Sequence, residues 1–215
     1  MAAGRADARG GLLAWSASCL VIGTMALTLA ASLNPNPTGV NAAAVLEVAM
    51  APGGRWLAMA AALLIGSVAL LAGLPTLLIP FRDRARGLAM AAVATLAVGV
   101  LGSSGYAALL VFVRALADQE ALRPGRLPRA LEDAEVVMVL FVWVGSFYLG
   151  VLLMAVALLR ARVAAPWVPI VLLVVVGCLP LVSMAGHIGQ VVQVLLLAVA
   201  FTEIATRAVQ RATPA

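Results

Sequence analysis

Charged residues are scarce in this chain of 215 residues: Asp, Glu, Lys and Arg make up 11%, against roughly 25% in an average soluble domain. Lysine is absent, so all 14 basic residues are arginine. Hydrophobic residues make up 64%, and the mean hydropathy is +1.11. A soluble domain of this length cannot bury so much apolar surface, and a disordered chain does not contain it. The composition therefore predicts an integral membrane protein.

Residues that bind metals or form disulfides are also few. The chain has two cysteines, Cys19 and Cys178, and one histidine, His187. Both cysteines lie inside apolar runs, so we interpret them as small hydrophobic residues. No CxxC or CxxCH pair, no Walker loop and no GxGxxG motif occurs. We therefore expect no metal, haem or nucleotide cofactor.

Apolar residues gather in long uninterrupted runs. A helix needs about 20 such residues to cross a bilayer, whereas a membrane strand needs about ten residues of alternating character. We divide the last run at the small and polar stretch 183–189. The sequence predicts an all-α polytopic membrane protein, with residues 1–215 as a single integral membrane domain folded as a compact bundle of six transmembrane helices. The predicted spans are about 11–33, 56–80, 87–113, 135–159, 166–184 and 188–208.

The arginines indicate how the chain is oriented. With the amino terminus inside, nine of the 14 arginines lie on the inner side and five on the outer side, which favours cytoplasmic termini. They stand at the ends of apolar runs rather than on a soluble face, so we expect membrane lipid, and no nucleic acid, as a partner. Arginine without lysine, together with abundant alanine, is typical of a GC-rich bacterium. We therefore predict a multi-pass protein of the bacterial inner (plasma) membrane.

Two outer loops and one span carry further patterns. Residues 41–50 are expected to form a short interfacial helix, and the charged loop 114–135 is either a solvated connector or a lid over an outward-facing cavity. Small residues recur every four positions in the third span, which favours close helix packing. We predict that this span is central and contacted by at least two others. The small residues are Gly87, Ala91, Thr95, Gly99 and Ser103.

Polar side chains at membrane depth are the default candidates for function. His187 lies in the predicted turn between the last two spans, and Gln190 and Gln193 follow at helical spacing. Their ordinary role is hydrogen bonding between helices, and their functional role would be the rim of a polar pocket. With three aromatic residues, they form the set of candidate ligand contacts. The set is Tyr106, Trp143, Tyr148, His187, Gln190 and Gln193.

Three glutamates are candidate acids. Glu203 precedes Arg207 by one helical turn, which favours an ion pair. Glu135 begins the fourth span, where the helix dipole stabilises an acidic residue. Glu47 lies on the expected interfacial helix. A carboxylic acid kept protonated in an apolar cavity would initiate an isomerisation or cyclisation, and aromatic faces such as Trp56 would stabilise the cation.

The order and texture of the chain resemble an uncharacterised family of bacterial six-span membrane proteins, a domain of unknown function. The resemblance lies in GGLLAW at the first span, in TGVNAAAVLEVAMAPGGRWLAMAAALL, in LEDAEVVMVLFVWVGSFYLGVLL, and in RARVAAPWVPIVLLVVVG before the fifth span. It implies a fold but supplies no activity, so no residue role comes from it.

Three functions remain open on the sequence. The leading hypothesis is a bundle that binds or moves a small apolar or amphipathic molecule between its helices near the outer leaflet. The second is an intramembrane enzyme acting on a lipidic or prenyl substrate through a buried glutamate. The third is a structural subunit of a membrane complex. The oligomeric state is left open.

Overall fold

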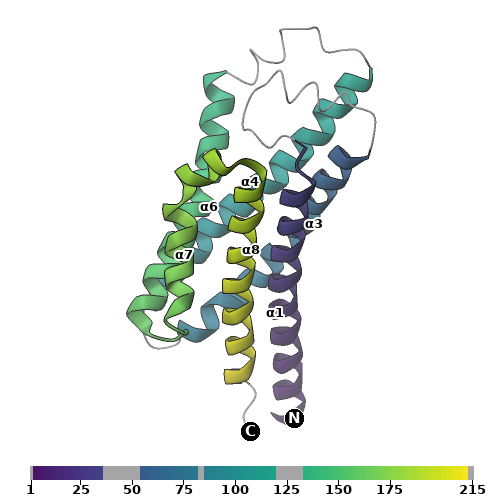
Figure 1. The fold of residues 1–215 in the computed structure, drawn as a ribbon. Coiled ribbons are helices and arrows are strands. Elements are labelled where there is room, and N and C mark those ends of the chain that lie inside the picture. Colours follow the sequence, from purple (N-terminus) through teal and green to yellow (C-terminus); the bar gives the residue numbers. More distant parts are fainter. Residues whose placement is uncertain (1, 36–53, 82–84, 120–132, 213–215) are drawn as a thin grey trace.

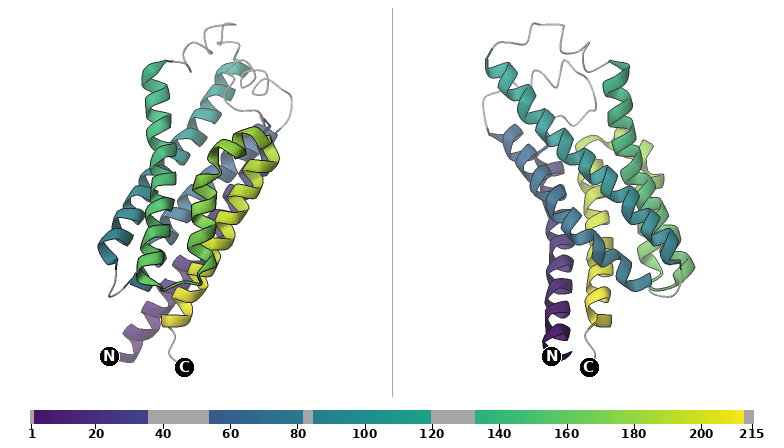
Figure 2. Two further views of the ribbon diagram at one scale, coloured as in Figure 1. Left: turned by 60° about the vertical axis from the view of Figure 1, so that its left-hand side comes forward. Right: turned by 180° about the vertical axis from the view of Figure 1, so that it is seen from behind.

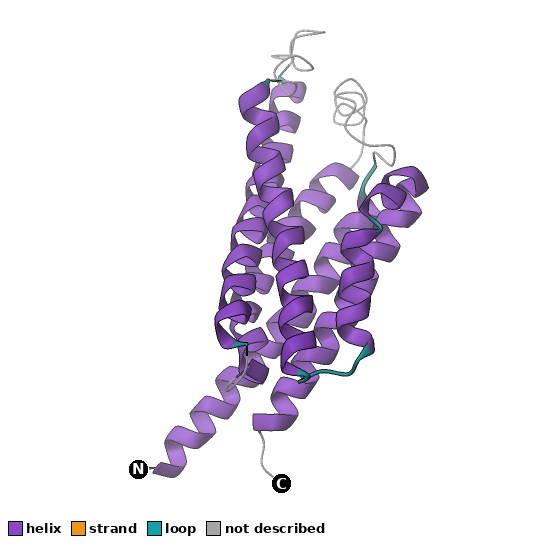
Figure 3. Cartoon of the chain, turned by 90° about the vertical axis from the view of Figure 1, so that its left-hand side faces the viewer, coloured by secondary structure: helices purple, strands orange, loops and turns teal. Residues whose placement is uncertain are grey.

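The computed structural model describes residues 2–35, 54–81, 85–119 and 133–212. Within these ranges every regular element is a helix and none is a strand (Figure 3). The all-α prediction is therefore confirmed for this part of the chain. The expected interfacial helix over 41–50, with Glu47, and most of the charged loop 114–135 lie outside the described residues.

Five stretches are long and apolar enough to cross a membrane: Gly11–Leu33, Arg55–Phe81, Arg86–Leu116, Ala134–Ala161 and Met184–Arg211. Each begins and ends within about four residues of a predicted span. The helices that contain them and the shorter α7 follow one another in the chain. They are α1 (Ala2–Leu33), α3 (Arg55–Gly73), the 3-10 helix η1 (Leu74–Phe81), α4 (Arg86–Asp118), α6 (Ala134–Ala161), α7 (Trp167–Gly177) and α8 (Leu179–Ala212).

The fifth predicted span differs from the others. The 11 residues of α7 rise roughly 16 Å, about half the thickness of a bilayer core. The helix is interrupted because Pro180 has no N–H to donate to the carbonyl of Val176. The N–H of Cys178 still makes the α-helical bond to the carbonyl of Val174, and it also bonds to the carbonyl of Val176. The apolar stretch then continues into the first turns of α8. Six crossings therefore stay a prediction, while five helices meet the length criterion.

The chain reverses direction inside α8 at Gly186. Its backbone has φ 61° and ψ −139°, a conformation that a residue with a Cβ rarely adopts. This position lies within the 183–189 stretch where the sequence predicts the last two spans to divide. The residues before Gly186 connect to α7, and the long segment after it descends alongside α1 (Figure 1).

The six helices form a closed ring. Each packs against two neighbours in the order α1, α3, α4, α6, α7 and α8, and α8 returns to α1. Figure 2 shows the ring from two sides, with the start of α1 and the end of α8 at the same end of the molecule. The third predicted span, α4, contacts α3 and α6 as expected, but it is not central. It is one member of the ring, like the other five.

Glycine allows α4 and α6 to approach closely at the middle of the ring. A Cβ added to Gly99 would lie 2.5 Å from the backbone of Phe147, which is closer than two non-bonded carbons approach. Where lipid surrounds the helices, such close contact supplies the packing energy that burial from water would supply in a soluble protein.

The core fills the half of the ring near η1, which contacts α1, α4 and α8 and closes that end. Large side chains from all the helices are fully buried there, among them Leu20, Leu77, Phe81, Leu96, Met154, Leu172 and Phe201. The opposite half is less filled. A smaller cluster around Trp56 joins α1, α3 and α4, but no residue of α6 before Gly150 is buried.

Candidate functional site

A cavity of about 470 Å³ lies in the less filled half of the ring. Residues from all six helices line it, so no single helix pair accounts for it. Its volume falls in the range of roughly 300–1,000 Å³ that is typical of small-molecule sites. Most of the wall is apolar. Examples from five of the helices are Leu27, Met59, Leu63, Val144, Val175 and Leu197.

Gln193 supplies the most buried polar group of this wall, with only 7% of its surface exposed. Its Nε2 donates a hydrogen bond of 2.8 Å to the carbonyl of Val175, in the last turn of α7. A carbonyl in that turn has no partner within its own helix, so the amide satisfies it. The hydroxyl of Tyr148 donates to Oε1 of Gln193 at 3.3 Å. One side chain of α8 thus holds α6 and α7 at the cavity wall.

Asn34 joins the end of α1 to α8 beside the same cavity. Its Nδ2 donates a hydrogen bond of 3.1 Å to Oε1 of Gln190, and Asn34 itself lines the cavity. Gln190 does not line it. Asn34 is not among the candidates predicted from the sequence because it lies just past the end of the first predicted span. The signal that would have indicated it is an amide at the same end of the bundle as Gln190 and Gln193.

The candidate ligand contacts divide into two groups. Tyr106, Trp143, Tyr148 and Gln193 line the cavity, together with Ser103, another residue that the candidate set omits. His187 and Gln190 are not among the lining residues. His187 follows Gly186 directly, and its Nδ1 is buried without a hydrogen-bond partner in the described part of the chain.

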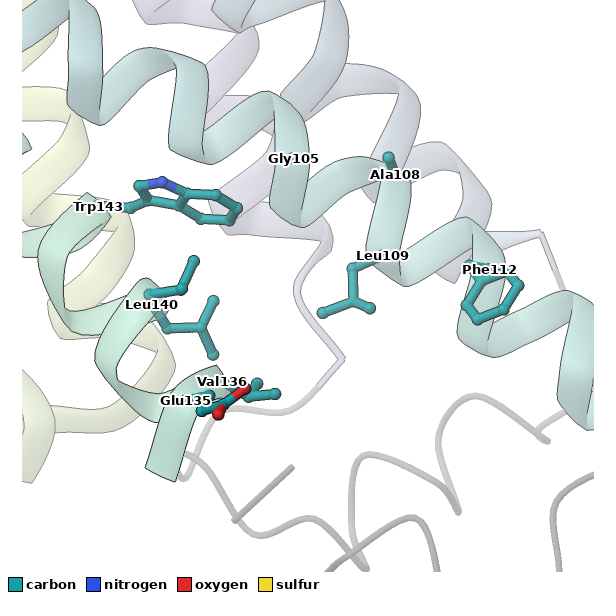
Figure 4. Close-up of a pocket in the computed structure, with 9 residues that line it drawn as sticks. Gly105, Ala108, Leu109, Phe112, Glu135, Val136, Leu140 and Trp143 are labelled. Carbon is teal, nitrogen blue, oxygen red and sulfur yellow. The ribbon is translucent and has the colours of Figure 1, made fainter. Parts of the chain in front are cut away.

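A second, apolar groove of about 590 Å³ lies between the outer halves of α4 and α6 (Figure 4). Leu109 of α4 and Leu140 of α6 face each other across it, and Trp143 points from α6 toward Gly105. Leu140 and Trp143 line both the groove and the central cavity, so the two spaces share a wall.

Two of the candidate acids, Glu135 and Glu203, lie apart from the cavity, and Glu47 lies outside the described residues. Glu203 accepts a hydrogen bond of 2.6 Å from Nε of Arg207, which forms the ion pair that the spacing predicts. Glu135 is exposed at the outer end of the groove, and its backbone N–H bonds to the side chain of Asp133, the N-cap of α6. Among the described residues, no carboxylate lines the central cavity.

The remaining candidates are accounted for by packing. Trp56 is buried away from the cavity, and its indole N–H donates a 2.8 Å hydrogen bond to the carbonyl of Leu110, which fastens α3 to α4. Cys19 and Cys178 are free thiols, both half-buried. In the described part of the chain, no group of three or more His, Cys, Asp or Glu side chains is placed to hold a metal ion.

No family model, no curated protein and no solved structure matches the chain. The resemblance to an uncharacterised bacterial six-span family therefore stays a prediction from the sequence.

Proposed function

We propose that this protein binds, or moves, a small uncharged amphipathic molecule in the central cavity of a six-span helical ring. The observation that carries this proposal is the 470 Å³ cavity, to which all six helices contribute. If the ring served only stability, we would expect apolar side chains to fill it along its whole length. In this protein they do so only around Leu77 and Phe81. The other half of the ring leaves room for a ligand.

The polar groups of the wall indicate the chemistry of this ligand. Asn34, Ser103, Tyr106, Tyr148 and Gln193 carry uncharged hydrogen-bonding groups, and the described lining contains no charged side chain. A charge buried at membrane depth without a partner is costly, so a ligand bearing a formal charge would lack compensation there. A molecule with a hydroxyl, ester or carbonyl group and an apolar body fits this wall.

The location in the bundle supports a ligand drawn from the membrane. The cavity lies toward the end opposite the start of α1 and the end of α8. In the proposed orientation, with both termini in the cytoplasm of a bacterium, this end faces the outer leaflet. The surrounding helices expose many large apolar side chains, which suits direct contact with lipid.

No observation supports either alternative function as directly as the cavity supports ligand binding. The acid-initiated enzyme requires a carboxylic acid in an enclosed apolar space, but Glu203 pairs with Arg207 and Glu135 is exposed. Glu47 lies outside the described residues. A purely structural subunit would not require a cavity between all its helices.

The test is native mass spectrometry of the purified protein and two variants. Ala31→Phe places a large side chain at the wall of the cavity, whereas Ala14→Phe makes the same change at an exposed position of α1 that lines neither space. We expect a retained neutral lipid or small molecule on the wild type and on Ala14→Phe, and its loss from Ala31→Phe. A wild type without any bound molecule, or equal retention by all three proteins, would contradict the proposal.

A further inference from the structure

We infer that the groove between α4 and α6 is a second subsite, which takes the hydrocarbon chain of the ligand whose polar group occupies the central cavity. This inference rests on the proposed function and names its ligand class: an uncharged lipid with a hydrogen-bonding head group and a single chain. The ligand then reaches the cavity sideways from the bilayer, between two helices, instead of from the aqueous end of the ring.

The first support is that the two spaces adjoin each other. The side chains of Leu140 and Trp143 line the groove on one side and the cavity on the other. Apart from Glu135, which is exposed at one end, the groove is lined by apolar residues, and it opens at the surface of α4 and α6, where Phe112 is 59% exposed. A chain lying in it would leave one hydrophobic medium, the lipid, for another, without crossing a polar layer.

The second support is the way in which α4 accommodates Trp143. A Cβ on Gly102 would overlap the Trp143 side chain, and a Cβ on Gly105 would lie 2.8 Å from the edge of its ring. The absence of these two side chains creates the space in which the indole lies between α4 and α6 (Figure 4). The Trp143 side chain therefore lies between the groove and the cavity, and a ligand chain that extends from one to the other must pass it.

The third support is the loose packing of α6 in this region. No residue of α6 before Gly150 is buried. Close contacts with α4 begin at Trp143, where Gly102 lies against Trp143, Gly99 against Phe147 and Gly150 against Leu96. The first turns of α6, which border the groove, thus precede the close contacts with the glycines of α4.

Fluorescence quenching tests the subsite with a defined probe. A monoacylglycerol with a dibrominated chain is titrated into the protein in nanodiscs, because bromine quenches indole emission only near contact. The chain has four tryptophans, so the difference between the wild type and Trp143→Phe isolates the emission of Trp143. We expect saturable quenching of Trp143 by this probe, and only weak, non-saturable quenching by a brominated phosphatidylglycerol, whose head is charged.

Two variants fill the groove from its opposite walls: Ala108→Phe on α4 and Val139→Phe on α6. Each should raise the half-saturating probe concentration about tenfold, because the added ring occupies the space of the chain and removes its packing contacts. Ala94→Phe is the matched control, because Ala94 is exposed on α4 and lines neither space. Circular dichroism melting curves that match the control establish that the variants are folded.

The outcomes separate this inference from the proposed function. If Ala31→Phe abolishes saturable quenching while Ala108→Phe and Val139→Phe both bind like the wild type, the cavity binds a ligand but the groove does not hold its chain. If the wild type shows no saturable quenching of Trp143 by the neutral probe, the inference is overturned at once. If native mass spectrometry also finds no retained molecule, the proposed function falls with it.

Discussion

The side-chain amide of Gln193 links three helices at the cavity wall. It donates to the carbonyl of Val175 on α7 and accepts from the hydroxyl of Tyr148 on α6. Hydrogen bonds of this kind between membrane helices contribute about 0.6 kcal/mol on average and up to about 1.7 kcal/mol. Gln193 therefore links the helices of the ring and also presents a polar surface to the cavity.

Replacing this amide should weaken the protein measurably. Gln193→Leu removes both hydrogen bonds and leaves the Val175 carbonyl without that donor, so the free energy of unfolding should fall by about 1–2 kcal/mol. Unfolding in a titration with sodium dodecyl sulfate, followed by circular dichroism, measures the change. Gln210→Leu is the control, because Gln210 is exposed on the same helix. Equal losses in the two variants would show that the network contributes nothing specific.

Gly186 is the second position where one residue decides the local structure. With φ 61° and ψ −139°, its backbone is strained for any other residue, and Gly186→Ala should cost about 1–3 kcal/mol of the free energy of unfolding. Gly177→Ala is the matched control, since a Cβ there meets nothing within 4 Å and the φ of Gly177 is not positive. If both variants have the same melting temperature, the turn at Gly186 does not carry this strain.

At the scale of elements, glycine contacts decide which helices approach and where they separate. At Gly99 and Gly150 the backbones of α4 and α6 come close together, whereas the second half of α4 and the first half of α6 enclose the groove. The same two helices therefore form both a tight junction and the groove. The junction holds α6 against α4, and the part of α6 that precedes it borders the groove.

Enlarging Gly99 should push these helices apart. A Cβ at this position would lie 2.5 Å from the backbone of Phe147, which cannot rotate away as a side chain could, so Gly99→Ala should lower the free energy of unfolding by about 1–3 kcal/mol. Gly145→Ala on α6 is the control, because a Cβ there has open space. Melting curves in detergent measure the difference, and an unchanged Gly99→Ala would show that the junction is looser than described.

The helices could be predicted from the sequence because each consists of a long apolar run with arginine, proline or glycine at its ends. The turn at Gly186 was also indicated, since small and polar residues interrupt the last run there. The 3-10 helix η1 was not predicted, because hydropathy does not distinguish it from the α-helix that it continues. Nor was the early end of α7, although Pro180 marks it in the sequence.

The cavity could be predicted only in part. Gln193 stood out as an amide at membrane depth, and Tyr106, Trp143 and Tyr148 as aromatic residues in two spans. That these four line one space, and that His187 and Gln190 do not, depends on where α6 departs from α4. This departure depends on packing between distant segments, which no local pattern records. Asn34 and Ser103 were missed because their importance arises only from their neighbours in the ring.

At the scale of the whole molecule, the ring has a filled half and a hollow half. The filled half, near η1, holds most of the core and gives the protein its stability. The hollow half holds the cavity, the groove and the uncharged polar side chains. This separation allows a ligand to occupy one half without disturbing the packing of the other, so substitutions at cavity positions such as Ala31 should change binding more than stability.

The most direct test of this account is an experimental density map of the protein in a lipid nanodisc, with a bound fiducial to aid alignment. If the ring binds a lipid as proposed, the map contains an elongated density inside the ring that is not protein, with one end within hydrogen-bonding distance of Tyr148 or Gln193. A map in which side chains close the space between the six helices, or in which the cavity holds only water, would rule out the proposed function.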